Sequence, residues 1–179
     1  YAALFEHAPR ALVVDRHPDY ASSQLARRRA IAERLPLFEV QHHHAHAAAC
    51  LAENGWPLDG PAVLGVVLDG LGLGDDGALR GGEFLLAGYR NATRVGTLKP
   101  VAMIGGDQAS REPWRNLYAQ IVAEMGWPAF VSRFGELEVH RRLAEKPLQV
   151  IDRMLAVGLN VPLASSCGRL FDAVAAAVG

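Results

Sequence analysis

Hydrophobic positions along the chain follow two different periods. Short apolar or β-branched runs, typical of strands, occupy residues 12–14, 38–40, 63–68, 83–89 and 93–98. Longer runs of helix-forming residues occupy residues 19–35, 42–54, 113–125, 128–160 (with breaks) and 167–178, the last capped by Ser165 and Ser166. This order of strands and helices predicts a mixed α/β fold, and it does not suit a helical bundle or a β-sandwich.

A glycine-rich segment follows the most apolar strand. It begins with Asp69, Gly70, Leu71 and Gly72 and holds four glycines in residues 69–77. We therefore expect a turn or hairpin tip there, and a loop at residues 103–111. Backbone N–H groups exposed after a strand can hold phosphate oxygens, although an ordinary hairpin is the simpler interpretation. The segment matches neither a Walker A loop nor a dinucleotide-binding fingerprint.

Four of the seven histidines lie within residues 42–46. On a helix, residues four apart share one face, so His42 and His46 are spaced to bind one transition-metal ion, and Asp69 can complete the site. His43 and His44 should point away from this face, where they could contact the metal ligands from outside or bind a phosphate. They also occupy the places where a zinc protease carries its glutamate, which argues against that class. A chance cluster of surface histidines is the alternative.

Three further residues have open interpretations. Asp172 lies on an otherwise apolar helix, where its carboxylate could bind ribose hydroxyls or simply face solvent. Cys50 and Cys167 are far apart and lack a CxxC partner, so packing is favoured for both thiols. This cysteine usage predicts a reducing, cytoplasmic location without a disulfide framework.

Charge and hydropathy exclude two classes of partner. The net charge is −1 with 21% charged residues, which gives no bias toward nucleic acid or a membrane surface. No apolar stretch approaches the roughly 18 residues that span a bilayer, and no signal peptide opens the chain. The chain starts without methionine and stops directly after a helix, so we expect a domain that is truncated at both ends.

Several motifs together resemble the C-terminal carbamoyltransferase domain of the HypF family. They are, in chain order, DRHPDY (residues 15–20), QHHHAH (41–46), DG (69–70), a GGE turn (81–83), GGD with REPWR (105–115) and SSCGRLFDA (165–173). The resemblance covers nearly all of residues 1–179. It implies that the chain is part of a single carbamoyltransferase domain. It implies an actin/Hsp70-like ATPase fold, which is ribonuclease H-like and incomplete here. The domain is also similar to tRNA threonylcarbamoyl transferases and antibiotic O-carbamoyltransferases.

The resemblance also implies roles for particular residues. His42, His46 and Asp69 would bind iron or zinc. Asp69 and residues 70–72 (Gly70, Leu71, Gly72) would lie against the phosphate and acyl group of a carbamoyl-adenylate made from ATP, and Asp172 would hold its ribose. No catalytic residue is assigned. The family usually has threonine where Leu71 stands and an aromatic residue where Leu73 stands.

The expected function is one step in building the cyanide ligands of [NiFe]-hydrogenases. In this family, carbamoyl is transferred from carbamoyl-adenylate to the C-terminal cysteine of the HypE protein. HypE and other domains of the parent chain are therefore the expected partners. The alternatives are a related transferase that acts on tRNA or on a small-molecule hydroxyl, and a non-catalytic module that binds metal or nucleotide.

Overall fold

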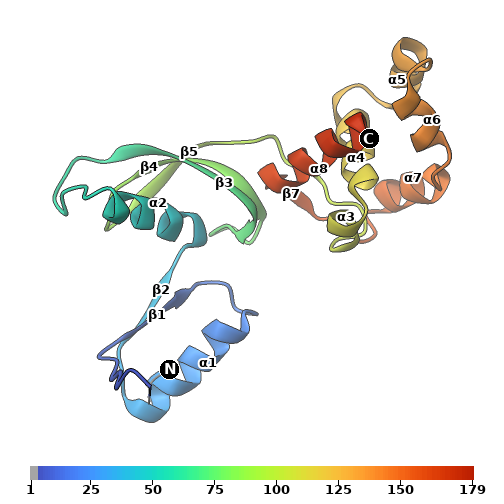
Figure 1. Ribbon diagram of the computed structural model, residues 1–179. Helices are drawn as coiled ribbons and strands as arrows, with labels where there is room; N and C mark the ends of the chain where they lie inside the picture. The colour runs from blue at the N-terminus through green and yellow to red at the C-terminus, as the bar shows by residue number, and fades with distance from the viewer. Residues whose placement is uncertain (1–3) are drawn as a thin grey trace.

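The N-terminal part of the protein is a small parallel α/β unit. The computed structural model describes residues 4–179. Strand β1 (Leu12–Asp15), helix α1 (Ala21–Glu33) and strand β2 (Leu37–Val40) follow one another. The two strands are parallel, with Asp15 opposite Val40, and α1 makes the crossover that a parallel pair requires. This unit lies apart from the rest of the molecule in Figure 1, joined through the link from β2 to α2.

The central part is an antiparallel sheet with one helix on it. Helix α2 (His42–Glu53) is followed by β3 (Val63–Leu73), β4 (Leu79–Ala87) and β5 (Ala92–Thr97). Ala47 of α2 packs on Val67, Leu85 and Ala87, so these residues form a small core between helix and sheet. Apolar side chains of alternate strand residues remain exposed: Leu64, Val66, Leu68 and Leu86.

The C-terminal part is mostly helical and joins the same sheet. Its elements are β6 (Val101–Ala102), α3 (Gln108–Arg111), α4 (Pro113–Glu124), α5 (Trp127–Phe134), α6 (Glu138–Ala144), α7 (Leu148–Val157), β7 (Leu163–Ser166) and α8 (Cys167–Val178). Strand β7 pairs in parallel with the start of β4 and antiparallel with β6. The main core gathers around Tyr118, Ile104, Leu143 and Ile151. It lies in the helical lobe of Figure 1.

The mixed α/β class is confirmed. The glycine-rich segment 69–77 does contain the tip of the β3–β4 hairpin, but only in its last four residues, and the GGE turn predicted at 81–83 is wrong. Strand β3 continues through Gly70 and Gly72 to Leu73, because Gly72 and Leu73 pair with Arg80 and Leu79 after a register shift. The turn lies at residues 74–77, where Gly77 has a φ of +75°. The GGE motif at 81–83 lies within β4 for the same reason, since cross-strand pairing outweighs the turn preference of glycine.

Other differences are smaller. Residues 103–111 are not all loop, since α3 forms a single turn there. Strands β6 and β7 were not expected, and Ser166 alone caps α8 by accepting a hydrogen bond from the Arg169 N–H group. Within residues 4–179, none of the helices has the length and hydropathy required to cross a bilayer.

Candidate metal centre

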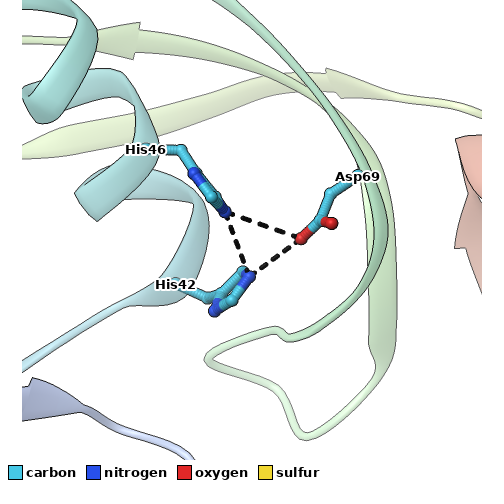
Figure 2. Close-up of side chains that lie close together, drawn as sticks. All are labelled: His42, His46 and Asp69. Carbon is cyan, nitrogen blue, oxygen red and sulfur yellow. Dashed lines mark hydrogen bonds and ion pairs between the residues drawn. The ribbon is translucent and has the colours of Figure 1, made fainter.

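Two histidines of α2 and one aspartate of β3 converge on one point (Figure 2). Gln41 caps the helix by accepting a hydrogen bond from the His44 N–H group at 2.8 Å, which places His42 in the first turn. His42 Nε2 then lies 2.8 Å from Asp69 Oδ2 and 3.3 Å from His46 Nε2. His46 Nε2 and Asp69 Oδ2 are 3.7 Å apart. The structure thus brings together all three residues predicted to bind metal.

The separations of these three atoms suit a metal ion. Nitrogen and oxygen ligands lie about 2.0–2.2 Å from zinc in tetrahedral sites, so two ligand atoms are about 3.3 Å apart. The three measured distances, 2.8, 3.3 and 3.7 Å, lie around that value. Two imidazoles and a carboxylate are donors that zinc and iron both accept. The side chain of His46 is 56% exposed, so this side of the group is open to a further ligand.

Asp15 contacts the opposite side of the His42 ring. Its Oδ2 atom is 2.5 Å from His42 Nδ1, and its Oδ1 atom accepts a hydrogen bond from the His17 N–H group at 2.7 Å. Asp15 belongs to the DRHPDY motif, but no role was predicted for it. A signal was present, because Asp15 ends a strand parallel to β2, and β2 leads directly into His42.

The carboxylates of Asp15 and Asp69 favour a positive charge at the His42 ring. Burial alone would lower the pKa of His42, but hydrogen bonds and charge from Asp15 and Asp69 raise it above its ordinary value. Burial would raise the pKa of Asp15, yet the hydrogen bonds from His42 and the His17 backbone lower it overall. An imidazole between two carboxylates therefore lies in an electrostatic environment suited to a cation.

His43 and His44 point away from the group, as the sequence predicted. His43 is buried, with Nδ1 3.1 Å from Gln41 Nε2, and burial lowers the pKa of its ring. His44 Nε2 lies 2.7 Å from the carbonyl oxygen of Gly88. Both rings border a polar hollow of about 530 Å³ that also contacts Arg80 and Glu83.

The predicted phosphate segment lies between α2 and the start of α8. A Cβ atom added at Gly72 would lie 2.5 Å from the His42 ring and 2.8 Å from the His43 ring. A Cβ atom added at Gly168 would lie 2.9 Å from the Gly70 Cα atom. Ser166 Oγ donates a hydrogen bond to the Gly70 carbonyl, so β3 and the N-terminus of α8 are in contact. Glycine is therefore required at positions 72 and 168 for close approach.

Two other predicted site residues lie outside the group of three. Leu71 is half-buried and packs on the small core of Met103, Ala109 and Ala164. The carboxylate of Asp172 pairs with Arg169, with Oδ2 2.8 Å from Nε. The same oxygen accepts a hydrogen bond of 3.5 Å from the side-chain nitrogen Nδ2 of Asn116. Any contact of Asp172 with a ribose would have to coexist with the Arg169 pair.

Comparison with known proteins gives the family. Residues 65–179 match the family model described as the second subdomain of the carbamoyltransferase Kae1-like domain, and residues 1–53 match the HypF Kae1-like domain. The chain belongs to the HypF carbamoyltransferase family. The resemblance found in the sequence is thereby confirmed. His42 and His46 lie in the segment matched by one family model and Asp69 in the segment matched by the other.

Individual HypF proteins are similar over the whole chain. Carbamoyltransferase HypF of Rhodobacter capsulatus is 50% identical over 179 residues, which are 100% of this chain and 23% of that protein. HypF2 of Cupriavidus necator is 45% identical over 98% of this chain and 20% of its own length. A crystal structure of full-length HypF in the phosphate- and nucleotide-bound form has a TM-score of 0.82 at 32% identity, covering 100% of this chain and 22% of that one. The chain thus spans 20–23% of the length of these HypF relatives.

Proposed function

We propose that this chain provides the metal-binding part of a HypF carbamoyltransferase. His42, His46 and Asp69 bind one iron or zinc ion, and carbamoyl passes from carbamoyl-adenylate to the C-terminal cysteine of HypE. The observation that carries the proposal is the convergence of three ligand atoms within 4.8 Å of one another. Membership of the HypF family supports the reaction class.

The chemistry requires an activated carbonyl and a thiolate. Carbamoyl-adenylate is a mixed anhydride, so attack of the thiolate on the carbonyl carbon forms a C–S bond, breaks the C–O bond to phosphate and releases AMP. A bound divalent ion supplies stabilisation of the negative charge that develops on oxygen. The open side beside His46 is where the substrate would approach. We propose that the acceptor thiol comes from the partner. Cys167 of this chain is buried, as expected for a packing thiol, whereas Cys50 is exposed on α2 and the packing predicted for it is wrong.

The nucleotide is proposed to lie where β3 meets α8. The N-terminus of this 12-residue helix carries partial positive charge and backbone N–H groups that favour phosphate. Gly168 leaves the approach free of a side chain, and Asp172 follows one turn later for the ribose. The Gly70 N–H group is bound to Asp69 Oδ1 at 2.6 Å, so it orients the metal ligand as well as bordering the nucleotide. The mixed α/β architecture and the match to the Kae1-like domain support the actin/Hsp70-like fold that we propose for this chain.

A transferase acting on tRNA is less well supported. Nucleic-acid-binding proteins usually carry a basic surface, whereas this chain has a net charge of −1. The two free cysteines support a reducing, cytoplasmic environment, in which the HypE acceptor thiol would also stay reduced.

The experiment is a transfer assay that follows the acceptor by mass spectrometry. A HypF protein containing this sequence is supplied with ATP, carbamoyl phosphate and HypE, and the C-terminal peptide of HypE is examined for one added carbamoyl group. The expected result is carbamoylation by the unchanged protein and its loss in His42→Ala, with His44→Ala as the matched control. Carbamoylation of HypE by the His42→Ala variant at the unchanged rate would overturn the proposal.

A further inference from the structure

The His42 ring is held between carboxylates from two distant segments. Asp15 Oδ2 lies 2.5 Å from Nδ1, and Asp69 Oδ2 lies 2.8 Å from Nε2. Asp15 ends β1 in the N-terminal unit, whereas Asp69 belongs to the central sheet. The two ring nitrogens therefore have different environments, and only Nε2 faces His46.

The carboxylate of Asp15 is itself held in place. Its Oδ1 atom accepts a hydrogen bond from the His17 N–H group at 2.7 Å, and its backbone oxygen accepts one from Ser23 Oγ at 2.8 Å. Ser23, in the first turn of α1, is fully buried. The His17 ring stacks on Tyr20 with centroids 4.2 Å apart and planes 2° from parallel, which holds the same turn. Asp15 thus presents an oxygen atom at a defined position.

This arrangement determines which nitrogen of His42 can bind a metal. Asp15 lies against Nδ1, on the side of the ring away from His46 and Asp69, so it does not join their group of ligands. When an ion lies between Nε2 and Asp69, the carboxylate at Nδ1 accepts the remaining ring proton, so that the Nε2 lone pair is directed at the ion. It also limits the rotation of the ring.

We propose that Asp15 is a positioning residue for the metal centre, acting on the ion only through His42. The inference rests on the proposed metal site and adds a contribution from the N-terminal unit to it. Partners of this kind affect metal affinity about 10- to 100-fold in other proteins. The side chain of Asp15 is only 18% exposed, so solvent competes weakly for the hydrogen bond.

The test measures metal affinity directly. Zn²⁺ binding to the purified chain is measured by competition with a chromogenic chelator for the unchanged protein, Asp15→Asn and Asp19→Asn. Asp19 is the matched control, because it is an exposed carboxylate in the same turn. We expect binding about 10- to 100-fold weaker in Asp15→Asn and a change of less than about twofold in Asp19→Asn. Equal affinity of Asp15→Asn and the unchanged chain would overturn the inference.

A double-mutant cycle separates positioning from a general effect on the fold. In a His42→Ala background, the weak residual binding by the two remaining donors is measured at high free Zn²⁺, and Asp15→Asn should weaken it no further, since the residue through which Asp15 acts is gone. An equal loss in both backgrounds would show that Asp15 acts by another route, and the inference would fail. If the unchanged chain bound no metal at all, the proposed metal site would fail first.

A measurement on the unchanged protein covers the case in which Asp15→Asn does not fold. Long-range ¹H–¹⁵N NMR spectra of the Zn²⁺-loaded chain distinguish the two ring nitrogens of His42. We expect a proton on Nδ1 and the ion on Nε2. The ion on Nδ1, with the proton on Nε2, would contradict the proposal.

Discussion

His42 Nε2 and Asp69 Oδ2 lie 2.8 Å apart, although the two residues belong to segments that match different family models. The site is therefore assembled from both segments, and neither contains it alone. Helix α2 contributes its imidazoles because its first turn is capped by Gln41, and β3 contributes the carboxylate from a strand paired along most of its length. Mutations that separate helix from strand should therefore disturb metal binding even where no ligand is changed.

The proposed metal ligands can be tested by measuring the metal content of the purified chain. The purified chain, prepared anaerobically with iron or zinc present, should carry one ion. His42→Ala and His46→Ala should each lose it, because two remaining donors bind a divalent ion poorly. Elemental analysis by mass spectrometry measures the result. His44→Ala is the control, because His44 lies two positions from both His42 and His46 and its ring is hydrogen-bonded to the Gly88 carbonyl instead; this variant should retain the ion. Retention of the ion by His42→Ala would exclude this ligand set.

Gly72→Ala should disrupt the site without removing a ligand. The new Cβ atom would lie 2.5 Å from His42 Cδ2 and 2.8 Å from His43 Cε1, so both rings must move. We expect a loss of about 1–3 kcal/mol in the free energy of unfolding, together with weaker Zn²⁺ binding. Urea unfolding and chelator competition measure the two effects. Gly70→Ala is the control, because a Cβ atom there meets nothing within 4 Å.

Gly168→Ala should separate α8 from β3. Its Cβ atom would lie 2.9 Å from the Gly70 Cα atom, and backbone cannot rotate away as a side chain can. The helix gains propensity from alanine, but the contact should dominate, with a net loss of about 1–3 kcal/mol in unfolding free energy. Thermal unfolding followed by circular dichroism would show it as a lower Tm. Gly88→Ala has open space and should leave Tm nearly unchanged, while an unchanged Tm in Gly168→Ala would contradict this packing.

Tyr118 should make stability depend on alkaline pH. Its hydroxyl is buried and donates a hydrogen bond to Asp152 Oδ1 at 2.6 Å. Burial, with the hydrogen bond and charge of Asp152, raises the pKa of Tyr118 well above its ordinary value of 10.0. The folded state therefore keeps a proton that the unfolded state releases, so stability is complete below about pH 10 and falls as pH rises further.

Tyr118→Phe provides the comparison. It should lose about 1–3 kcal/mol near neutral pH, because a buried hydrogen bond to a carboxylate is removed, and it should lose less on going above pH 10. Urea unfolding at pH 7 and pH 10.5 measures both quantities. Tyr89→Phe, whose hydroxyl donates at 2.9 Å to the Trp56 carbonyl at an exposed site, should keep the alkaline slope.

Local patterns were sufficient to predict part of the site. The spacing of His42 and His46 determines their common face wherever the segment is helical, and Asp69 follows the most apolar strand in the sequence. The extension of β3 through Gly70 and Gly72 was not predicted, because it depends on the pairing of Gly72 and Leu73 with Arg80 and Leu79 of β4 after a register shift. The short, polar strand β7 likewise depends on partners far away in sequence.

The directions in which the side chains point were also not predicted from the sequence. Leu71 lies in the predicted phosphate segment, but its side chain packs on the core of Met103 and Ala164, because β3 carries it toward β7. The role of Asp15 depends on β1 being parallel to β2, which places the ends of both strands at the same edge. A carboxylate at the end of a strand beside a predicted metal-binding helix would have been the clue.

Asp15 lies 27 positions before His42, and Asp69 lies 27 positions after it. Two loops of equal length must therefore close before the ion has its full environment, so metal uptake would follow the docking of β1 and β3 on α2. The core around Tyr118 contributes no residue to the site. Asp15 contacts His42 and Arg16 contacts Asp75 without involving the ion, so these contacts hold the N-terminal unit to the central sheet, and a protease would reach the Gln41 link first wherever they open.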